Sequence, residues 1–179
     1  MGCKVSEVQI LSPRFFIRRC VGMARHIVGV VGAGECDETV YVMAEEVGRR
    51  LAECQYVVLT GGRTGVMEAA SHGAKQAGVL TVGILPGNNP QDANPYVDIP
   101  IATGLQDARN AIVARASEIL IAIAGEYGTL SEIALALKMG RRVIGLGTWH
   151  IAKAVQVVET PQQTVAGVIR YFETHSYSI

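Results

Sequence analysis

Residues 124–132 read AGEYGTLSE, and they follow a short apolar run, ILIAI at 119–123, that is rich in β-branched side chains. A run of this kind is typical of a strand buried on both faces of a parallel sheet. The segment that comes next, IALALKM at 133–139, is rich in helix-forming residues. The sequence therefore predicts a strand, a tight glycine turn and a helix in direct succession.

The glycine turn has two interpretations that are compatible with each other. Gly125 and Gly128 allow the backbone to turn sharply and a ligand to approach closely, and the unpaired amides at a helix start suit a phosphate. Thr129 and Glu132 also have the spacing of a capping box, which would stabilise the helix without any ligand. Because a lone glycine turn is weak support for a binding site, both interpretations stay open at this point.

The composition limits the class of protein. The 179-residue chain is 49% hydrophobic and 18% charged and contains 20 glycines, which fits one domain built on a buried parallel sheet. Basic and acidic residues number 16 each, so no bulk positive charge is present to attract nucleic acid or an anionic membrane. The apolar runs fall well short of the ~20 residues of a membrane-spanning helix. We expect neither nucleic acid nor a membrane as a partner.

The cysteines and histidines give no sign of a disulfide scaffold or a metal centre. The four cysteines are Cys3, Cys20, Cys36 and Cys54, and none are in C-x-x-C spacing. The four histidines are scattered and form no H-E-x-x-H pattern. We therefore expect a protein of the reducing cytoplasm with no metal site built from its own side chains.

Residues 1–22 differ from the rest of the chain. Three arginines lie around the apolar group FFI at 15–17, which is too short for the hydrophobic region of a signal peptide and is not followed by a small-residue cleavage site. Met23 lies just before the first predicted strand. We expect residues 1–22 to be a disordered extension or to precede the true translation start, and residues 23–179 to form a single Rossmann-like domain that binds a nucleotide or phosphate.

The remaining chain alternates strands and helices. Strands are predicted at 27–31, 56–59, 80–85, 97–101, 119–123 and 142–146, the last being the final strand, and helices at 39–53, 65–77, 105–117, 130–139 and 161–174. This order predicts an α/β fold with a single doubly wound parallel sheet, Rossmann-like, with helices on both faces. The side chains expected to face the core in the first helix are Val42, Ala44, Val47 and Leu51.

Three strand-to-helix turns carry glycines, and such turns meet at the carboxyl edge of a parallel sheet. The glycines are Gly32, Gly34, Gly61, Gly62, Gly125 and Gly128. Their convergence favours a phosphate-containing ligand. The P-loop signature and the G-x-S-x-G nucleophile elbow are both absent. The first turn also lacks the third glycine of the dinucleotide fingerprint, and the second strand ends in TGGR rather than in an acidic residue, so NAD is disfavoured.

Two segments resemble the motifs of a known family. Residues 61–69, GGRTGVMEA, resemble the G-G-x-x-G-x-M-E/x-A motif of the Lonely Guy (LOG) family, also called lysine decarboxylase-like, and residues 125–132 resemble its P-G-G-x-G-T-x-x-E motif. Arg109 and Asn110 stand where that family has Arg-Lys. The resemblance covers about 27–149 and implies a Rossmann-like dimer or tetramer that cleaves the N-glycosidic bond of nucleoside 5′-monophosphates.

The resemblance also implies roles for individual residues. If the protein is a hydrolase, Arg109 and Glu132 correspond to the catalytic pair, with Arg109 orienting the phosphate and Glu132 acting as acid/base or stabilising the oxocarbenium-like ribose. Together with the converging turns, it gives a predicted ligand-binding set of Gly32, Gly34, Gly61, Gly62, Arg63, Gly125, Glu126, Gly128 and Thr129.

The sequence departs from the LOG pattern at three positions: Ala124 replaces the motif proline, Glu126 its second glycine and Asn110 the lysine. A carboxylate at position 126 would repel a phosphate on the neighbouring amides, unless it points away or binds a sugar hydroxyl or another polar group. This form of the motif is similar to the branch of molybdenum cofactor carrier proteins, which are proposed to bind a pterin phosphate.

The sequence leaves more than one function open. The preferred one is a module that binds a small phosphorylated, nucleotide-like molecule, with the molybdenum cofactor, its pterin or a nucleotide as the bound group and no cofactor required. The alternatives are a nucleoside 5′-monophosphate phosphoribohydrolase and, more weakly, a nucleotide sensor that acts with a partner. The helix at 130–139 has more apolar faces than one sheet covers, so a homo-oligomer, a dimer or tetramer, is expected.

Overall fold

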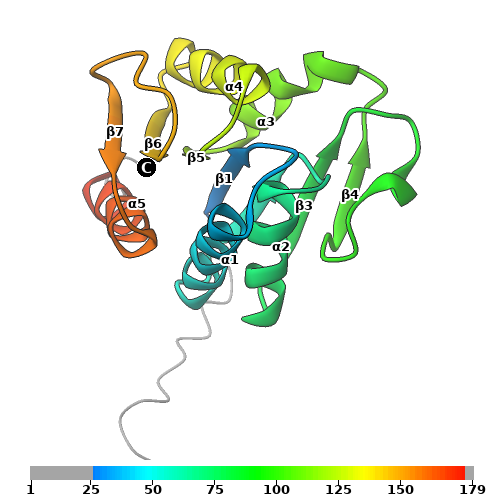
Figure 1. Ribbon diagram of the computed structural model, residues 1–179, viewed down its shortest axis with the longest axis horizontal. Coiled ribbons are helices and arrows are strands. Elements are labelled where there is room, and N and C mark those ends of the chain that lie inside the picture. Colours follow the sequence, from blue (N-terminus) through cyan, green and yellow to red (C-terminus); the bar gives the residue numbers. More distant parts are fainter. Residues whose placement is uncertain (1–25, 176–179) are drawn as a thin grey trace, which may run out of the picture.

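The protein, seen here as a computed structural model that describes residues 26–175, is built on a seven-stranded, all-parallel sheet with the strand order β4-β3-β2-β1-β5-β6-β7 (Figure 1). The strands are β1 (Ile27–Gly32), β2 (Val57–Thr60), β3 (Thr81–Leu85), β4 (Ile99–Ala102), β5 (Ile119–Ile123), β6 (Arg142–Leu146) and β7 (Val155–Val158). The α-helices are α1 (Glu38–Glu53), α2 (Val66–Gln76), α3 (Asn110–Ala116), α4 (Tyr127–Lys138) and α5 (Pro161–His175), and 3-10 turns cover Pro90–Asp92 and Gln106–Arg109. The predicted α/β, Rossmann-like sheet is confirmed, and the prediction for residues 1–22 lies outside the described residues.

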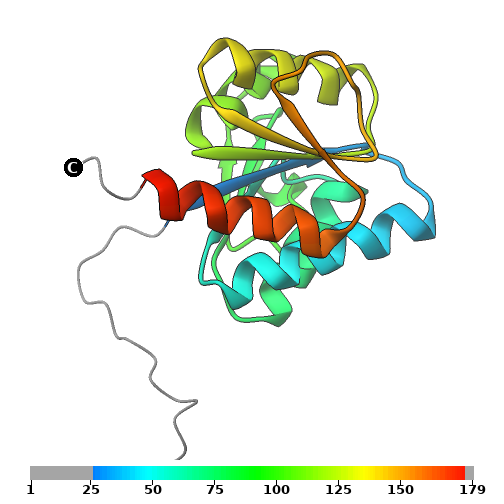
Figure 2. The same cartoon turned by 90° about the vertical axis from the view of Figure 1, so that its left-hand side faces the viewer.

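Helices cover both faces of the sheet, with α1, α2 and α5 on one face and α3 and α4 on the other (Figure 2). The strand β5, which lies beside the central strand β1, is completely buried, as its unbroken apolar run predicts. Its side chains alternate between the two cores: Ile119, Ile121 and Ile123 pack with α1, α2 and α5, and Leu120 and Ala122 pack with α3 and α4. Packing on both faces therefore fixes the position of the carboxyl end of β5, where the glycine turn begins.

The inward face of α1 was predicted correctly except at one residue. Ala44, Val47 and Leu51 are fully buried, whereas Val42 is 51% exposed. Two residues along an α-helix correspond to a rotation of about 200°, so a side chain at position 42 cannot share the face of Ala44. Gly48 complements the inward stripe instead, because it is buried and leaves room for α2.

Two predicted boundaries were wrong. The sheet does not end at β6, because β7 pairs with β6 in parallel. This edge strand is only four residues long and leaves Val157 49% exposed, so its sequence carries no alternating pattern to reveal it. The predicted helix at 105–117 is also divided: a 3-10 turn ends at Arg109 and α3 begins at Asn110.

Hydrogen bonds hold the turns at the carboxyl edge of the sheet in place. Between the first two turns, the Val66 amide donates to the Ala33 carbonyl at 3.0 Å and the Thr64 hydroxyl donates to the Gly34 carbonyl at 2.8 Å. In the turn after β5, the Ala124 amide donates to the carbonyl of Leu146, at the end of β6. The ends of β1, β2, β5 and β6 are thereby tied into one edge, where parallel α/β sheets bind ligands.

Glycines let α1 and α2 approach closely, and this contact supports the first two turns. A methyl group on Gly73 would overlap the carbonyl oxygen of Glu45. We expect Gly73→Ala to lower the free energy of unfolding by about 2 kcal/mol, because the overlap outweighs the better helix propensity of alanine. Urea denaturation measures the change. Gly128→Ala is the matched control, since a methyl there meets no atom within 4 Å; equal stability of the two variants would contradict the close-contact role of Gly73.

Candidate functional site

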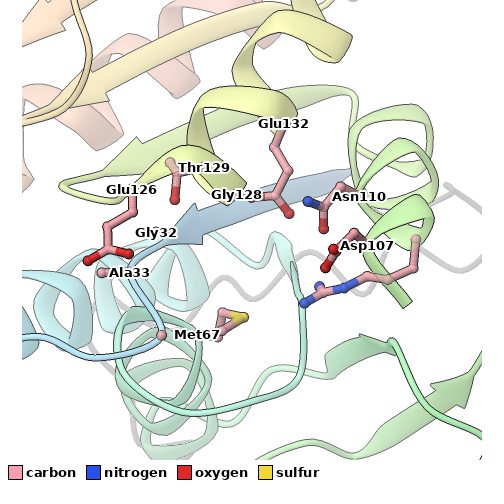
Figure 3. Close-up of a pocket in the computed structure, with 11 residues that line it drawn as sticks. Gly32, Ala33, Met67, Asp107, Asn110, Glu126, Gly128, Thr129 and Glu132 are labelled. Carbon is pink, nitrogen blue, oxygen red and sulfur yellow. The ribbon is translucent and has the colours of Figure 1, made fainter. Parts of the chain in front are cut away.

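Two adjoining cavities, which share lining residues, lie at the carboxyl ends of β1, β2 and β5. Figure 3 shows the inner one. The inner cavity, of about 230 Å³, is lined by Gly32, Ala33, Gly34, Met67, Asp107, Arg109, Asn110, Glu126, Gly128, Thr129 and Glu132. The outer cavity, of about 450 Å³, is lined by Gly34, Glu35, Arg63, Thr64, Met67 and Glu126. The two share Gly34, Met67 and Glu126, so a ligand with two chemically different ends can occupy both.

Most of the residues that the sequence predicts for the site line these cavities. Those that do are Gly32, Gly34, Arg63, Arg109, Glu126, Gly128, Thr129 and Glu132. Gly61, Gly62 and Gly125 lie outside the lining, and their roles are structural. A methyl on Gly61 would overlap the guanidinium of Arg109, one on Gly125 would overlap Thr129, and Gly62 has a φ of 73°.

Arg109 brings a buried, unpartnered donor to the inner cavity. It ends the 3-10 turn before α3, and its side chain is packed beside Gly61, which leaves the residue only 8% exposed. Its Nη1 atom is buried and has no hydrogen-bond partner. Burial lowers the pKa of the guanidinium and the nearby Glu132 opposes that shift, but an arginine stays charged in any case. A buried N–H group without an acceptor is costly, and the cationic guanidinium at the wall of the cavity suits an anionic ligand.

Glu132, on the first turns of α4, faces the same cavity and is 6% exposed. Burial raises the pKa of its carboxyl group to about 7, although the charge of Arg109 acts in the opposite direction. The carboxyl group therefore exchanges its proton near neutral pH, which is the property of a general acid or base. Figure 3 shows Glu132 at the Asn110 side of the cavity and Glu126 at the Ala33 side.

The capping-box interpretation of the glycine turn is wrong. Helix α4 begins at Tyr127, and the residue in the N-cap position is Glu126, whose side chain makes no capping hydrogen bond. Thr129 is therefore inside the first turn of the helix, where a capping box cannot form. The hydrogen bond at the start of the helix runs from the Leu130 amide to the Glu126 carbonyl at 2.9 Å. The amides before Leu130 have no acceptor within the helix, which suits an anion.

The turn itself is clamped by the segment after β6. Ala124 has a φ of 47°, in the left-handed region that favours glycine. Its carbonyl accepts a hydrogen bond from the Thr148 hydroxyl, and the Gly125 carbonyl accepts one from the Trp149 indole at 3.1 Å. Thr148 and Trp149 were not identified from the sequence, because a contact across 24 residues leaves no local pattern.

Four further lining residues complete the inner cavity, and one of them is Ala33 in the first turn. Met67 belongs to the LOG-like segment, so its position in that motif could have identified it as a site residue. Asp107 carries no such motif and is recognisable only by its proximity to Arg109 in the sequence. Asn110, which stands at the LOG lysine position, donates to the Ser131 hydroxyl at 3.0 Å, and that hydroxyl donates to the Gly128 carbonyl. Asn110 thus connects α3 to the start of α4.

Within residues 26–175, no group of three or more His, Cys, Asp or Glu side chains is arranged to hold a metal ion. None of the helices in that part of the chain is long and apolar enough to cross a membrane.

The chain belongs to the SLOG cluster4 family, whose model matches residues 25–174. Two similar solved structures support the same assignment. The molybdenum cofactor binding protein of the phototrophic bacterium Rippkaea orientalis is 39% identical with a TM-score of 0.80, and the molybdenum cofactor carrier protein of Chlamydomonas reinhardtii is 38% identical with a TM-score of 0.76. Each comparison covers 84% of this chain and 99% of the other. The resemblance inferred from the two motifs is thereby confirmed.

Two relatives in sequence extend the comparison. A protein of the archaeon Archaeoglobus fulgidus is 47% identical over 138 residues, which are 77% of this chain and 91% of that protein. The cytokinin riboside 5′-monophosphate phosphoribohydrolase LOG of Oryza sativa subsp. japonica is 32% identical over 94 residues, or 50% of this chain and 38% of the rice protein. The chain thus spans less than half of the rice enzyme.

Replacing Glu132 by Gln should stabilise the protein above neutral pH. The raised pKa means that the native state binds more protons than the unfolded state between about pH 4.5 and 7, so stability falls as the pH rises through that range. The Glu132→Gln variant should lack this fall and should exceed the wild type at pH 8 by on the order of 2 kcal/mol. Urea denaturation at several pH values measures it, and parallel pH profiles would contradict the raised pKa.

Replacing Gly128 by Ala should separate binding from stability. The residue lies in α4 at the wall of the inner cavity, and a methyl group there meets no protein atom within 4 Å. We expect the thermal midpoint to be unchanged or higher, because alanine favours the helix by about 0.5–1 kcal/mol. The affinity for a phosphate ester should fall about tenfold or more, because the methyl group narrows the approach to the helix amides. Calorimetric titration measures it; full affinity would show that no ligand group comes close to Gly128.

Proposed function

We propose that the protein binds a small phosphorylated, nucleotide-like molecule in the two adjoining cavities and acts as a carrier of the molybdenum cofactor or its pterin. The observation that carries the proposal is the buried guanidinium of Arg109, whose Nη1 atom has no hydrogen-bond partner and which faces the inner cavity. The free amide end of α4 lines the same cavity through Gly128 and Thr129. A guanidinium and a helix N-terminus together are suited to a phosphate group.

The cavities fit such a cargo in size and in chemistry. The inner cavity matches a phosphate and the atoms next to it, and the outer cavity leaves room for a ring system. The two similar solved structures are described as a cofactor binding protein and a cofactor carrier protein, which favours this class of cargo for the chain. A carrier needs binding without reaction.

We also propose a homo-oligomer, a dimer or a tetramer, in the cytoplasm. The exposed large apolar side chains include Ile99 and Ile101 on the edge strand β4, Leu105 before α3 and Tyr127 at the start of α4. An apolar groove between α3 and α4, lined in part by Ala108, Ala111 and Leu135, adjoins the inner cavity. A second copy that covered these side chains would remove them from water.

A second function is favoured by one specific observation. Arg109 and Glu132 lie on the same cavity, and the Glu132 carboxyl has a pKa of about 7, which fits the acid/base group of a nucleoside 5′-monophosphate phosphoribohydrolase. The rice relative carries that activity in its name. Against it stand Glu126 and Asn110, which replace a glycine and a lysine of the LOG motif. We therefore place the carrier role first.

Titration calorimetry with GMP, AMP, CMP, UMP and a pterin phosphate tests the proposal, with chromatography of each mixture for free base. A carrier should release heat and no base, and Arg109→Met should lose about 30-fold or more in affinity because it removes a charged donor. Arg115→Met is the matched control, since Arg115 is exposed on α3, the helix that begins directly after Arg109. Absence of heat with every ligand would contradict binding. Base released by the wild type but not by Glu132→Gln would establish the hydrolase instead.

A further inference from the structure

The outer cavity carries charges that the phosphate site does not use. It is lined by Glu35, Arg63, Thr64 and Glu126, so two carboxylates face it against one guanidinium. The inner cavity also holds the carboxyl groups of Asp107 and Glu132, but it adds the donors that suit a phosphate, Arg109 and the free amides at the start of α4. These donors favour the phosphate of a ligand in the inner cavity, which leaves the other end of the ligand beside the carboxylates of the outer cavity.

The carboxylates of the outer cavity have no partner within the described part of the chain. Glu126 occupies the N-cap position of α4, yet its side chain makes no capping hydrogen bond. No hydrogen bond or ion pair involves the side chains of Glu35 or Arg63 among residues 26–175. These three side chains come from three different turns and meet at one cavity. Helix capping therefore does not explain why a glutamate stands at the start of α4.

Glu126 is the carboxylate that both cavities share. In Figure 3 it lies beside Ala33, at the side of the inner cavity remote from Asn110. An ionised carboxylate has two acceptor oxygens and no donor, so its best partner is a pair of adjacent N–H groups. A second phosphate at this place would be repelled. A neutral group with two N–H donors side by side would suit this place.

An aminopyrimidinone ring, the ring that guanine and pterins have in common, presents this pattern. Along one edge it carries a carbonyl oxygen, a ring N–H and an exocyclic amino group, in the order acceptor, donor, donor. The two donors match Glu126, and the carbonyl oxygen matches a donor such as Arg63. Adenine places a ring acceptor beside its amino group and mismatches the carboxylate, and hypoxanthine lacks the exocyclic amino group.

We propose that Glu126 selects the ligand's ring by binding the ring N–H and the amino group of an aminopyrimidinone. This inference rests on the proposed function, because it assumes a phosphorylated ligand whose phosphate lies in the inner cavity. It assigns to Glu126 a specificity-determining role, in which the carboxylate contacts a neutral ring of the ligand rather than a second phosphate.

The fluorescence of Trp149 provides the measurement. It is the only tryptophan of the chain, and its indole donates a hydrogen bond to Gly125 in the turn before α4. Titration of the full-length protein with GMP and with IMP isolates the exocyclic amino group, because the two nucleotides differ only there. We expect GMP to bind about tenfold more tightly than IMP, and AMP to bind no better than IMP.

Glu126→Gln should abolish the preference, because a glutamine side chain offers one acceptor and one donor group. The ratio of GMP to IMP affinity should fall to about 1, and the affinity for IMP should change less than about threefold, since phosphate contacts remain. Glu38→Gln is the matched control: Glu38 is an exposed glutamate in the first turn of α1 that lines neither cavity. Thermal unfolding of each variant confirms that it is folded.

The outcomes separate the two proposals. Equal binding of GMP and IMP by the wild type, or a preference that survives in Glu126→Gln, would overturn the role of Glu126 and leave the phosphate site intact. No binding of GMP, IMP, AMP or 6-hydroxymethylpterin phosphate would overturn the proposed function and this inference together. If the protein releases base, the same ratio is taken from kcat/KM. Tighter binding of the pterin phosphate than of GMP would identify the ring as a pterin, and the reverse order would identify it as guanine.

Discussion

The burial of β5 on both faces is the constraint on which the site depends. Because every side chain of this strand is in one of the two cores, the strand can neither slide nor rotate, and the chain must reverse immediately after Ile123. It does so through Ala124 at a φ of 47° and Gly125 at 101°. Helix α4 can then begin at Tyr127, with its first amides at the carboxyl edge of the sheet. The free amides at this edge of the sheet thus depend on packing elsewhere.

Two buried ionisable groups on one cavity are costly unless they have a use. Arg109 and Glu132 are 8% and 6% exposed, and burial shifts the pKa of both toward the neutral form. They influence each other electrostatically, yet no ion pair joins them in the described residues. An apolar pair of similar size would pack at lower cost. Groups kept in this state at the edge of a sheet are typical of a site prepared for a ligand.

The sequence predicted those parts of the structure that depend on local pattern. The apolar run of β5, the glycine turn and the helix after it were recognisable because each has its own composition. The prediction that Val42 faces the core was wrong because positions 42 and 44 lie on different faces of a helix. Strand β7 was missed because a four-residue edge strand has no alternating pattern. Nothing local distinguishes the buried Arg109 from the exposed Arg115, since burial depends on Gly61, far away in the chain. The clamp at Trp149 was unpredictable for the same reason.

The exchange of a glycine for Glu126 has a physical meaning once the two cavities are considered together. In a phosphate-binding turn, a glycine keeps the approach free for an anion, and a carboxylate there lowers the affinity for any second negative group. The inner cavity keeps its positive groups, Arg109 and the start of α4, although Glu126 borders both cavities. Specificity is a difference between the affinities for two ligands. Under the proposed role, Glu126 would repel a ligand with an extra phosphate and attract a neutral ring with two donors. The carboxyl edge of the sheet could therefore bind a monophosphate with a donor-rich ring without any change in the sheet itself.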